Sequence, residues 1–458
     1  MNDRYRVEHD SLGGIEVPAD ALWGAQTERS RRNFPIGTQR FAPHFIAAFA
    51  LVKKACALAN AELGNLDAAR ATLIAAACDE IIAGRLDAEF PLSVWQTGSG
   101  TQTNMNLNEV IANRANQLGG SAGPALHPND HVNRAQSSND VFPAVMHVAA
   151  VQRCDERLLP ALHTLRRALA GRAGAFADLL KTGRTHLMDA APVTLGQEFG
   201  AYAAQLGFCI ATIAEARESL LALALGATAV GTGLSAPPGW PARVCARLAQ
   251  LGGVPFRPAD NLFMAIAAHE PMLKFSAALR LLATALLKIA NDIRLLASGP
   301  RCGLAELRLP ANEPGSSIMP GKVNPTQAEA LTMVAVQVLG NDAAVAIAGS
   351  QGVLELNVYK PLIIHNVLES VELLADACES FALRCVDGIE ADPARLATYL
   401  DASLMLATAL NPHIGYEAAA RIARHAHEHG LSLRAAALAL GLVSAEDFDR
   451  WVRPADMV

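Results

Sequence analysis

The stretch 271-PMLKFSAALRLLATALLKIANDIRLL-296 decides the fold class of this chain. From Phe275 onward, large apolar residues recur at alternating spacings of four and three, which is the period of one α-helical stripe. The helix would be about 27 residues, or roughly 40 Å, long. Pro271 suits a first helical position, and Gly299-Pro300 is a stop signal. A second apolar face predicts that more than one neighbour covers this helix.

Four other long segments carry the same helical period: residues 155–180, 195–225, 326–348 and 361–388. Five long helices in the middle of a chain predict a bundle, and shorter amphipathic helices follow after residue 390. We therefore predict an all-α protein with three contiguous domains. They are a mainly helical N-terminal domain at 1–136, a central long-helix bundle at 137–363 and a small helical C-terminal domain at 364–458.

The composition also favours packed helices that bury surface between subunits. Apolar residues make up 51% of the chain, whereas aromatic residues make up 5% and charged residues 18%. An aromatic-poor, alanine-rich chain favours helices over strands, and its sparse charge indicates extra apolar surface. The net charge of -6, without a block of Lys and Arg, argues against a nucleic-acid partner.

A membrane span is the competing interpretation of the long apolar helix. Lys274, Lys288 and Asp292 interrupt it, and such charges are costly in lipid, so we predict no membrane partner. The eight cysteines form no CxxC pair, and the first ten residues contain no apolar run. Both features predict a reducing, cytoplasmic location.

Polar segments stand out against this apolar background as candidate sites. In 97-TGSGTQ-102, glycines, hydroxyls and amides suit a carboxylate, although a turn before a helix has the same composition. The segments 127-HPND-130 and 136-QSSND-140 follow, and the second is also typical of an ordinary helix N-cap. In 183-GRTHLMD-189, His186 is of a residue type suited to acid–base chemistry near neutral pH.

The segment 315-GSSIMPGKVNP-325 is the most informative of the polar segments. Its glycines and prolines predict a loop. Asn324 before Pro325 predicts an N-cap with proline at the first helical position, which would place Lys322 at a helix N-terminus. A lysine, hydroxyl groups and a helix N-terminus together can bind an anion and stabilise developing negative charge. Glu329 lies about one turn into that helix, where it could orient a histidine from another segment.

No metal and no cofactor are predicted from the sequence. His425, His427 and His429 are spaced by two, which does not bring them to one helix face, so we interpret them as solvated surface. No other His, Cys, Asp or Glu cluster has metal-ligand spacing, and no nucleotide-binding fingerprint follows a predicted strand.

In this order, the polar segments resemble those of the fumarase/aspartase superfamily, whose signature is similar to GSSIMPGKVNP. From DSLGGIEVPADALWGAQTERS near the start to WVRPADMV at the end, the chain resembles the iron-independent, class II fumarate hydratases. The resemblance covers essentially the whole length. It implies an all-helical, three-domain fold with a long central bundle. It also implies a homotetramer in which each active site combines segments from three subunits.

The resemblance further implies reversible hydration of fumarate to L-malate, a tricarboxylic acid cycle step, by anti addition and elimination of water without metal. Ser316 would take the carbon-bound proton, and His186, oriented by Glu329, would protonate the leaving hydroxyl. An older allocation makes His186 the base through a water. Lys322 and Asn324 would hold the carboxylate that accepts charge. The implied substrate-binding residues also include Ser99, Thr101, Ser137, Ser138, Asn139 and Thr185, and the implied second anion site comprises His127, Asn129 and Asp130.

Two alternatives stay open. Aspartate ammonia-lyases share the fold, but they typically have GRTQ at the positions of residues 183–186 and Pro-Ala-Lys at those of residues 320–322. Water is therefore favoured over ammonia. A catalytically silent structural member, as in lens crystallins, is the other alternative, and it is opposed by the retention of Ser316, Lys322, Asn324 and His186.

This chain departs from the family pattern at three places. Met188 stands where Gln usually follows GRTH, and residues 235–237 read Ser-Ala-Pro where Asn-Thr-His is usual. Pro124 and Ala125 occupy positions where basic residues are common, which weakens the expectation of a second anion site. These departures bear on efficiency and regulation more than on the type of reaction.

Overall fold

A computed structural model describes residues 4–458, which form two compact units. Unit 1 consists of the described part of Met1–Leu159 together with Ala211–Leu281 and Gln337–Leu373. Unit 2 consists of Pro160–Ile210, Leu282–Val336 and Leu374–Val458. The three domains expected from the sequence are a different division of the chain, and they stay a prediction.

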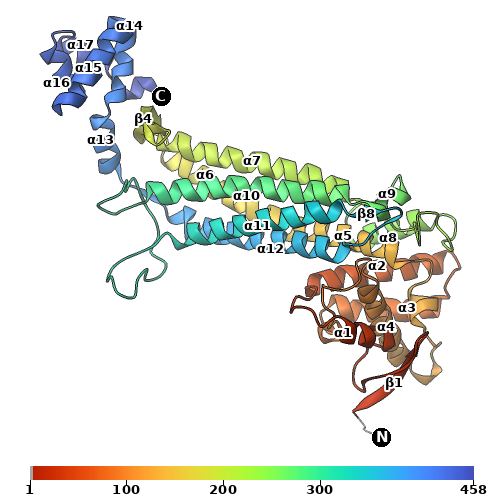
Figure 1. The fold of residues 1–458 in the computed structure, drawn as a ribbon. Helices are drawn as coiled ribbons and strands as arrows, with labels where there is room; N and C mark the ends of the chain where they lie inside the picture. Colours follow the sequence, from red (N-terminus) through yellow and green to blue (C-terminus); the bar gives the residue numbers. More distant parts are fainter. Residues whose placement is uncertain (1–3) are drawn as a thin grey trace. The chain divides into compact units, whose positions relative to one another are not determined.

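Helices make up most of both units, which confirms the all-α fold class (Figure 1). The α-helices are α1 Ala25–Asn33, α2 Pro43–Glu62, α3 Ala68–Ile82, α4 Thr101–Gly119, α5 Ser138–Arg153, α6 Leu159–Ala175, α7 Leu195–Ser219, α8 Trp240–Gly252, α9 Leu262–Ala267, α10 Glu270–Leu296, α11 Thr326–Gly349, α12 Lys360–Arg384, α13 Pro393–Ala402, α14 Asn411–Ile414, α15 Tyr416–His429, α16 Leu433–Ala439 and α17 Ala445–Trp451. In the described part of the chain, the strands form two-stranded pairs: β1 Tyr5–Asp10 with β2 Gly13–Pro18, β3 Leu180–Thr185 with β4 Met188–Thr194, β5 Ala222–Leu223 with β6 Arg257–Pro258, β7 Leu307–Arg308 with β10 Glu390–Ala391, and β8 Gly352–Val353 with β9 Leu356–Asn357.

The long helices follow the predicted apolar periods, and polar side chains join neighbouring helices within each unit. In unit 1, the Ser276 hydroxyl of α10 donates to Asp342 of α11 at 2.7 Å. In unit 2, the Tyr202 hydroxyl of α7 donates to Asp292 of α10 at 3.1 Å. Helix α10 therefore packs against α11 within unit 1 and against α7 within unit 2, as expected for long helices that lie side by side (Figure 1).

Three of the predicted long helices end earlier in the structure than the sequence pattern indicated. Helix α6 ends at Ala175, α7 at Ser219 and α12 at Arg384. Beyond the ends of α6 and α7, apolar residues continue, but Leu180 begins β3 and Ala222 begins β5. Strand hydrogen bonds replace helical ones there, and a buried apolar residue satisfies either pattern equally well.

The core of unit 1 near its candidate site is aromatic. Helix α2 packs against α3, α5 and α8. Phe45 and Phe49 of α2 lie against Phe142 of α5, with ring centroids 5.6 and 5.9 Å apart. A Cβ atom at Gly100 would lie 2.2 Å from the Phe142 ring, so the polar loop before α4 rests directly on this core.

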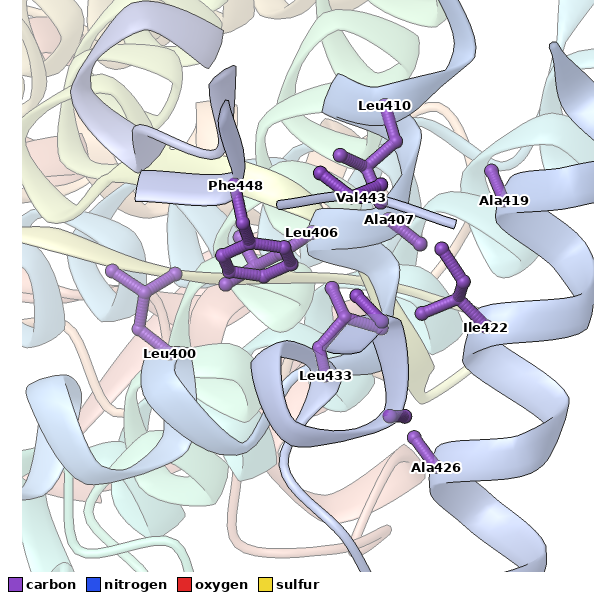
Figure 2. Packing of buried hydrophobic residues seen from close by; sticks show 12 residues of the cluster. Leu400, Leu406, Ala407, Leu410, Ala419, Ile422, Ala426, Leu433, Val443 and Phe448 are labelled. Carbon is purple, nitrogen blue, oxygen red and sulfur yellow. The ribbon is translucent and has the colours of Figure 1, made fainter. Parts of the chain in front are cut away.

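The short C-terminal helices of unit 2 surround an apolar core of their own. Leu406, Leu410, Ile422, Leu433 and Phe448 are buried and point toward one another (Figure 2). Helix α15 ends at the predicted turn, where the next residue has φ 63° and is a glycine. The expectation of short amphipathic helices after residue 390 is confirmed.

Among residues 4–458, three helices are long and apolar enough to cross a membrane, judged by length and composition alone: α2, α7 and α11. Helix α10, for which the membrane alternative was considered, is not among them. The apolar window of α2 is 67% buried, whereas that of α11 is 33% buried. Met333, Val336 and Ile347 of α11 are exposed. Much of the apolar surface of α11 is therefore uncovered in one chain.

Candidate active-site segments

Two helix N-termini meet in unit 1 at residues that the sequence assigned to substrate binding. Thr101 begins α4, Ser138 begins α5, and their hydroxyl oxygens lie 2.7 Å apart. Ser137 forms a capping box: its Oγ accepts the Asn139 N–H at 3.2 Å, and its N–H donates to Asp140 at 2.9 Å. The N-cap interpretation is confirmed. The positive ends of two helix dipoles lie together, an arrangement that suits a carboxylate.

Ser99 and Asn139, the other two substrate-binding residues that the resemblance implies in unit 1, are held nearby by hydrogen bonds. Ser99 Oγ accepts the Thr101 N–H at 3.4 Å, and the Asn139 amide donates to the Ala229 carbonyl at 2.8 Å. All of these hydroxyl and amide side chains are half-buried. The structure thus brings Ser99, Thr101, Ser137, Ser138 and Asn139 into one region of unit 1.

Asp140 ties this region to a second segment. Its buried carboxylate accepts the N–H groups of Gly226 at 3.0 Å and Thr228 at 2.9 Å. Burial raises the pKa of Asp140 to about 6, and the backbone donors oppose that rise. The Asp140 carboxylate therefore has a structural role, because it fixes both the start of α5 and the 226–229 turn.

The loop before α4 is held by a very close approach to the segment between β9 and α12. The Lys360 N–H donates to the Gly98 carbonyl at 3.1 Å. A Cβ atom at Gly98 would lie 1.3 Å from the Val358 carbonyl oxygen. Only glycine fits at this position without moving one of the two backbones.

Gly98→Ala is therefore expected to displace the loop and raise the KM for the dicarboxylate implied by the resemblance by more than about tenfold, with a lower Tm, because overpacking costs about 1–3 kcal/mol. Gly171→Ala is the matched control, since a Cβ atom there would meet nothing within 4 Å. That helical glycine should gain about 0.5–1 kcal/mol from alanine. Steady-state kinetics and thermal unfolding would measure both. An unchanged KM in the Gly98 variant would show that the contact with Val358 does not shape the site.

In unit 2, His186 lies at the tip of the β3–β4 hairpin. Thr185 pairs with Met188, so His186 and Leu187 form the two-residue turn. Their φ angles are 57° and 62°, as in a type I′ turn, where Asn and Gly are the usual residues. Thr185, His186, Leu187 and Met188 are exposed, so the hairpin presents the histidine to its surroundings. The family departure at Met188 lies directly beside it.

A cluster of buried charged side chains packs against strand β3 of this hairpin. Glu306 is 0% exposed, and its carboxylate lies 3.0 Å from Lys181 Nζ and 2.6 Å from an Arg184 nitrogen, both on β3. Lys181 also pairs with Glu198 at 2.8 Å. Glu306 directly precedes β7, on the segment that leads to the Ser316 loop. The cluster therefore joins the His186 hairpin to the chain segment that precedes the Ser316 loop.

Glu306→Gln is expected to destabilise the protein by about 3–5 kcal/mol, because it leaves Lys181 and Arg184 without their shared buried counter-charge. Glu390→Gln removes the same charge from an exposed position of unit 2 and should change stability by less than about 0.5 kcal/mol. Denaturant unfolding monitored by circular dichroism would measure both variants. Equal stability of the two would contradict a supporting function for the cluster.

The Ser316 loop closes on itself at its base. The Gly315 N–H donates to the Lys322 carbonyl at 2.8 Å, and the Asn324 amide donates to the Gly315 carbonyl at 2.7 Å. The expectation that Asn324 is the N-cap is wrong. The Pro325 carbonyl accepts the first helical bond, from the Glu329 N–H at 3.1 Å, so Pro325 holds that place. The Asn324 side chain is used to close the loop instead.

Ser316 lies at the start of this loop as a hydrogen-bond acceptor. Its Oγ accepts the N–H groups of Ile318 at 3.2 Å and Met319 at 3.0 Å. Donors directed at an oxygen favour its negatively charged form. This geometry suits a hydroxyl that must give up its proton in order to act as a base.

Lys322 and Glu329 are exposed in unit 2, as are Thr185 and His186. Within residues 4–458, the structure shows no hydrogen bond or ion pair between His186 and Glu329 of the same chain. The pairing of these two residues stays a prediction. These candidate residues of unit 2 are thus accessible at the surface of the chain.

The segment expected to form a second anion site is folded beside a cavity with mixed charges. The Asp130 N–H donates to His127 Nδ1 at 3.3 Å, and the Asp130 carboxylate lies 3.2 Å from the same nitrogen. His127 and Asn129 line a cavity of about 520 Å³ that Glu8, Asp10 and Glu109 also line. Glu8 is paired with Arg6 and Asp10 with Arg29, each at 2.8 Å, and the second anion site stays a prediction.

The histidines of α15 are a separate feature of unit 2. The rings of His425 and His429 lie 4.1 Å apart, and His427 is exposed. Across residues 4–458, no group of three or more His, Cys, Asp or Glu side chains has a geometry that could hold a metal ion.

Sequence reasoning missed several buried charged residues near the candidate segments, among them Lys53, Lys181, Glu306 and Lys360. Lys53 lies four residues after Phe49 and three before Cys56, on the buried face of α2. A lone lysine inside an apolar stripe was a usable signal. Glu306 lies between Ala305 and Leu307 in an irregular segment, and no periodic pattern marks it as buried.

Comparisons with known proteins show the family to which this chain belongs. Residues 13–340 match a lyase family model, and residues 406–458 match the model of the fumarase C C-terminus. The fold and these matches define a helical lyase. The chain is 62% identical to the class II fumarate hydratase of Thermosynechococcus vestitus, over 99% of this chain and 98% of that protein. It is 61% identical to that of Chromobacterium violaceum over 100% of both.

A solved structure agrees as well. The class II fumarase of Schistosoma mansoni superposes with a TM-score of 0.97 at 44% identity, over 99% of both chains. The chain therefore belongs to the class II fumarate hydratase family.

Proposed function

We propose that this protein catalyses the reversible hydration of fumarate to L-malate, a step of the tricarboxylic acid cycle. The observation that carries this proposal is the identity of 62% with a class II fumarate hydratase over 99% of the chain. The motifs GRTH and GSSIMPGKVNP agree with it, since each lies on an accessible turn or loop of unit 2.

The proposed mechanism begins at the carbon next to a carboxylate of L-malate. Ser316 takes the carbon-bound proton, and the electrons move into the carboxylate, which becomes an aci-carboxylate with extra negative charge. Lys322 and Asn324 hold that carboxylate, so their interaction strengthens as charge develops. The two N–H groups that point at Ser316 Oγ support its function as the base.

His186 then protonates the leaving hydroxyl, which departs as water on the opposite face. Glu329 orients this histidine, and in the hydration direction the same pair positions the attacking water. Substrate carboxylate and hydroxyl groups bind Ser99, Thr101, Ser137, Ser138, Asn139 and Thr185. The meeting of two helix N-termini at Thr101 and Ser138 supports a carboxylate there.

The active protein is proposed to be a homotetramer whose sites combine segments from different subunits. The uncovered apolar face of α11 supports this assembly, because other copies of the chain could cover it. His186 and residues 317–323, which follow the half-buried Ser316, are exposed in one chain, which is consistent with a site completed by a neighbouring subunit. A cytoplasmic location fits the eight cysteines, all of which are free thiols.

One assay distinguishes this function from its alternatives. Fumarate absorbance is followed with L-malate and then with L-aspartate, in buffer treated with a chelator. We expect fumarate to form from L-malate only. Formation from L-aspartate only would indicate an ammonia-lyase, activity only after iron is restored would overturn the metal-free mechanism, and no activity would indicate a silent structural member.

A further inference from the structure

A buried lysine lies behind the hydroxyl pair in unit 1. Lys53 of α2 is 0% exposed, although lysine is rarely fully buried. Its ammonium donates to two neutral oxygens, Asn133 Oδ1 at 3.1 Å and Gln136 Oε1 at 2.9 Å. Burial lowers the pKa of Lys53 to about 8, so the group is still mainly charged at neutral pH.

A continuous line of hydrogen bonds runs from Lys53 to the substrate-binding residues. Asn133 Oδ1 also accepts from Asn104 Nδ2 at 3.2 Å. The same Asn104 nitrogen donates to Ser138 Oγ at 3.0 Å, and Ser138 Oγ lies 2.7 Å from Thr101 Oγ1. Every member of this line belongs to unit 1.

The ammonium holds the oxygen of Asn133 toward itself, because it can donate but never accept. The Asn133 amide nitrogen donates to the Gln136 carbonyl at 3.2 Å and so favours the same orientation. Asn133 Oδ1 also accepts from Asn108 Nδ2 at 3.1 Å, so the amide nitrogens of Asn104 and Asn108 both point at this oxygen, and that of Asn104 also reaches Ser138. Ser138 Oγ then accepts from Asn104, and its own proton is left for Thr101 or a bound carboxylate.

We propose that Lys53 is a positioning residue, which orients the Ser138 hydroxyl so that it donates to a substrate carboxylate. The inference rests on the proposed function, in which Ser138 binds the dicarboxylate. Within residues 4–458, Asn104 Oδ1 is buried without a hydrogen-bond partner. Without Lys53, the Asn133 oxygen loses its charged donor and holds the Asn104 amide less firmly, so that the Asn104 amide can turn over and its oxygen can accept the Ser138 proton.

The first test compares two neighbouring lysines of α2. In Lys53→Met we expect the KM for L-malate and the Kd for succinate, a dicarboxylate that does not react, to rise about tenfold, with kcat within about threefold. Lys54→Met is the control, because Lys54 pairs with Asp79 on the surface at 2.6 Å and has no part in the line. An unchanged KM in Lys53→Met, or equal effects in the two variants, would overturn the proposal.

A second set of variants keeps the proposal testable if Lys53→Met does not fold. Asn104→Ala removes the donor to Ser138 and should raise KM to a similar extent. The double variant Lys53→Met/Asn104→Ala should then have a KM no higher than that of the poorer single variant, because both changes interrupt the same line of hydrogen bonds. A double variant in which the two increases in KM multiply, or an unchanged KM in Asn104→Ala, would contradict the proposal. Lys53→Arg, whose side chain also only donates, should recover part of the affinity that Lys53→Met loses. A folded Lys53→Arg variant that recovers no affinity would count against orientation by the lysine.

Failure of this inference is distinguishable from failure of the proposed function. Fumarate formation from L-malate by the unaltered protein tests the function alone. Ser138→Ala tests the binding assignment, and its KM should rise at least as much as that of Lys53→Met. If Ser138→Ala raises KM and Lys53→Met does not, only the positioning by Lys53 is wrong.

Discussion

Replacing Ser316 with alanine is expected to lower kcat for L-malate by at least about a hundredfold, the usual scale for loss of an acid–base group. The substitution removes one oxygen, whose two backbone donors come from Ile318 and Met319. Because the loop base is closed by Gly315, Lys322 and Asn324 through other atoms, its overall form should persist. The loss would therefore be chemical rather than structural.

The neighbouring serine supplies the control for this variant. Ser317 is exposed on the same loop, and Ser317→Ala should keep kcat within about threefold, because it leaves the base in place. Exchange of the carbon-bound proton of L-malate with solvent deuterium would be followed by NMR in parallel. Near-normal turnover and exchange in Ser316→Ala would refute Ser316 as the base and favour His186 acting through a water.

The positions of the long helices could be predicted because helical periodicity is a local property of the sequence. The apolar period that begins at Phe275 follows α10 almost from end to end. The ends of α6 and α7 could not be predicted, because the apolar residues after them serve a strand as well as a helix. Local pattern gives the type of element more reliably than its boundary.

The polar segments were also predictable, since hydroxyls, amides and glycines are conspicuous in an apolar chain. The way in which they are held was not. His186 and Leu187 occupy left-handed turn positions without the Asn or Gly that would announce such a turn. The partners of Glu306 on β3 are more than a hundred residues away in sequence. Tertiary packing alone brings these charges together, so no spacing rule could find them.

His186→Asn is expected to lower kcat by at least about a hundredfold, because the group that protonates the leaving hydroxyl is lost. Asparagine is the substitution of choice because His186 has φ 57°, and asparagine is one of the residues that accept this left-handed conformation. Leu187→Asn is the matched backbone control, since Leu187 has φ 62° and is 76% exposed. That control should keep its turnover and gain slightly in stability.

Ser316→Ala and His186→Asn should also differ in which step of the reaction they block. If Ser316 takes the proton and His186 serves the hydroxyl, Ser316→Ala loses both deuterium exchange and dehydration, whereas His186→Asn keeps exchange but loses dehydration. The ratio of exchange to dehydration, measured by NMR on L-malate in deuterated buffer, should therefore rise in His186→Asn by at least about tenfold. The opposite result would be the loss of both processes in His186→Asn and their retention in Ser316→Ala. It would assign the base to His186 on the β3–β4 hairpin, and the Ser316 loop would then only bind the carboxylate.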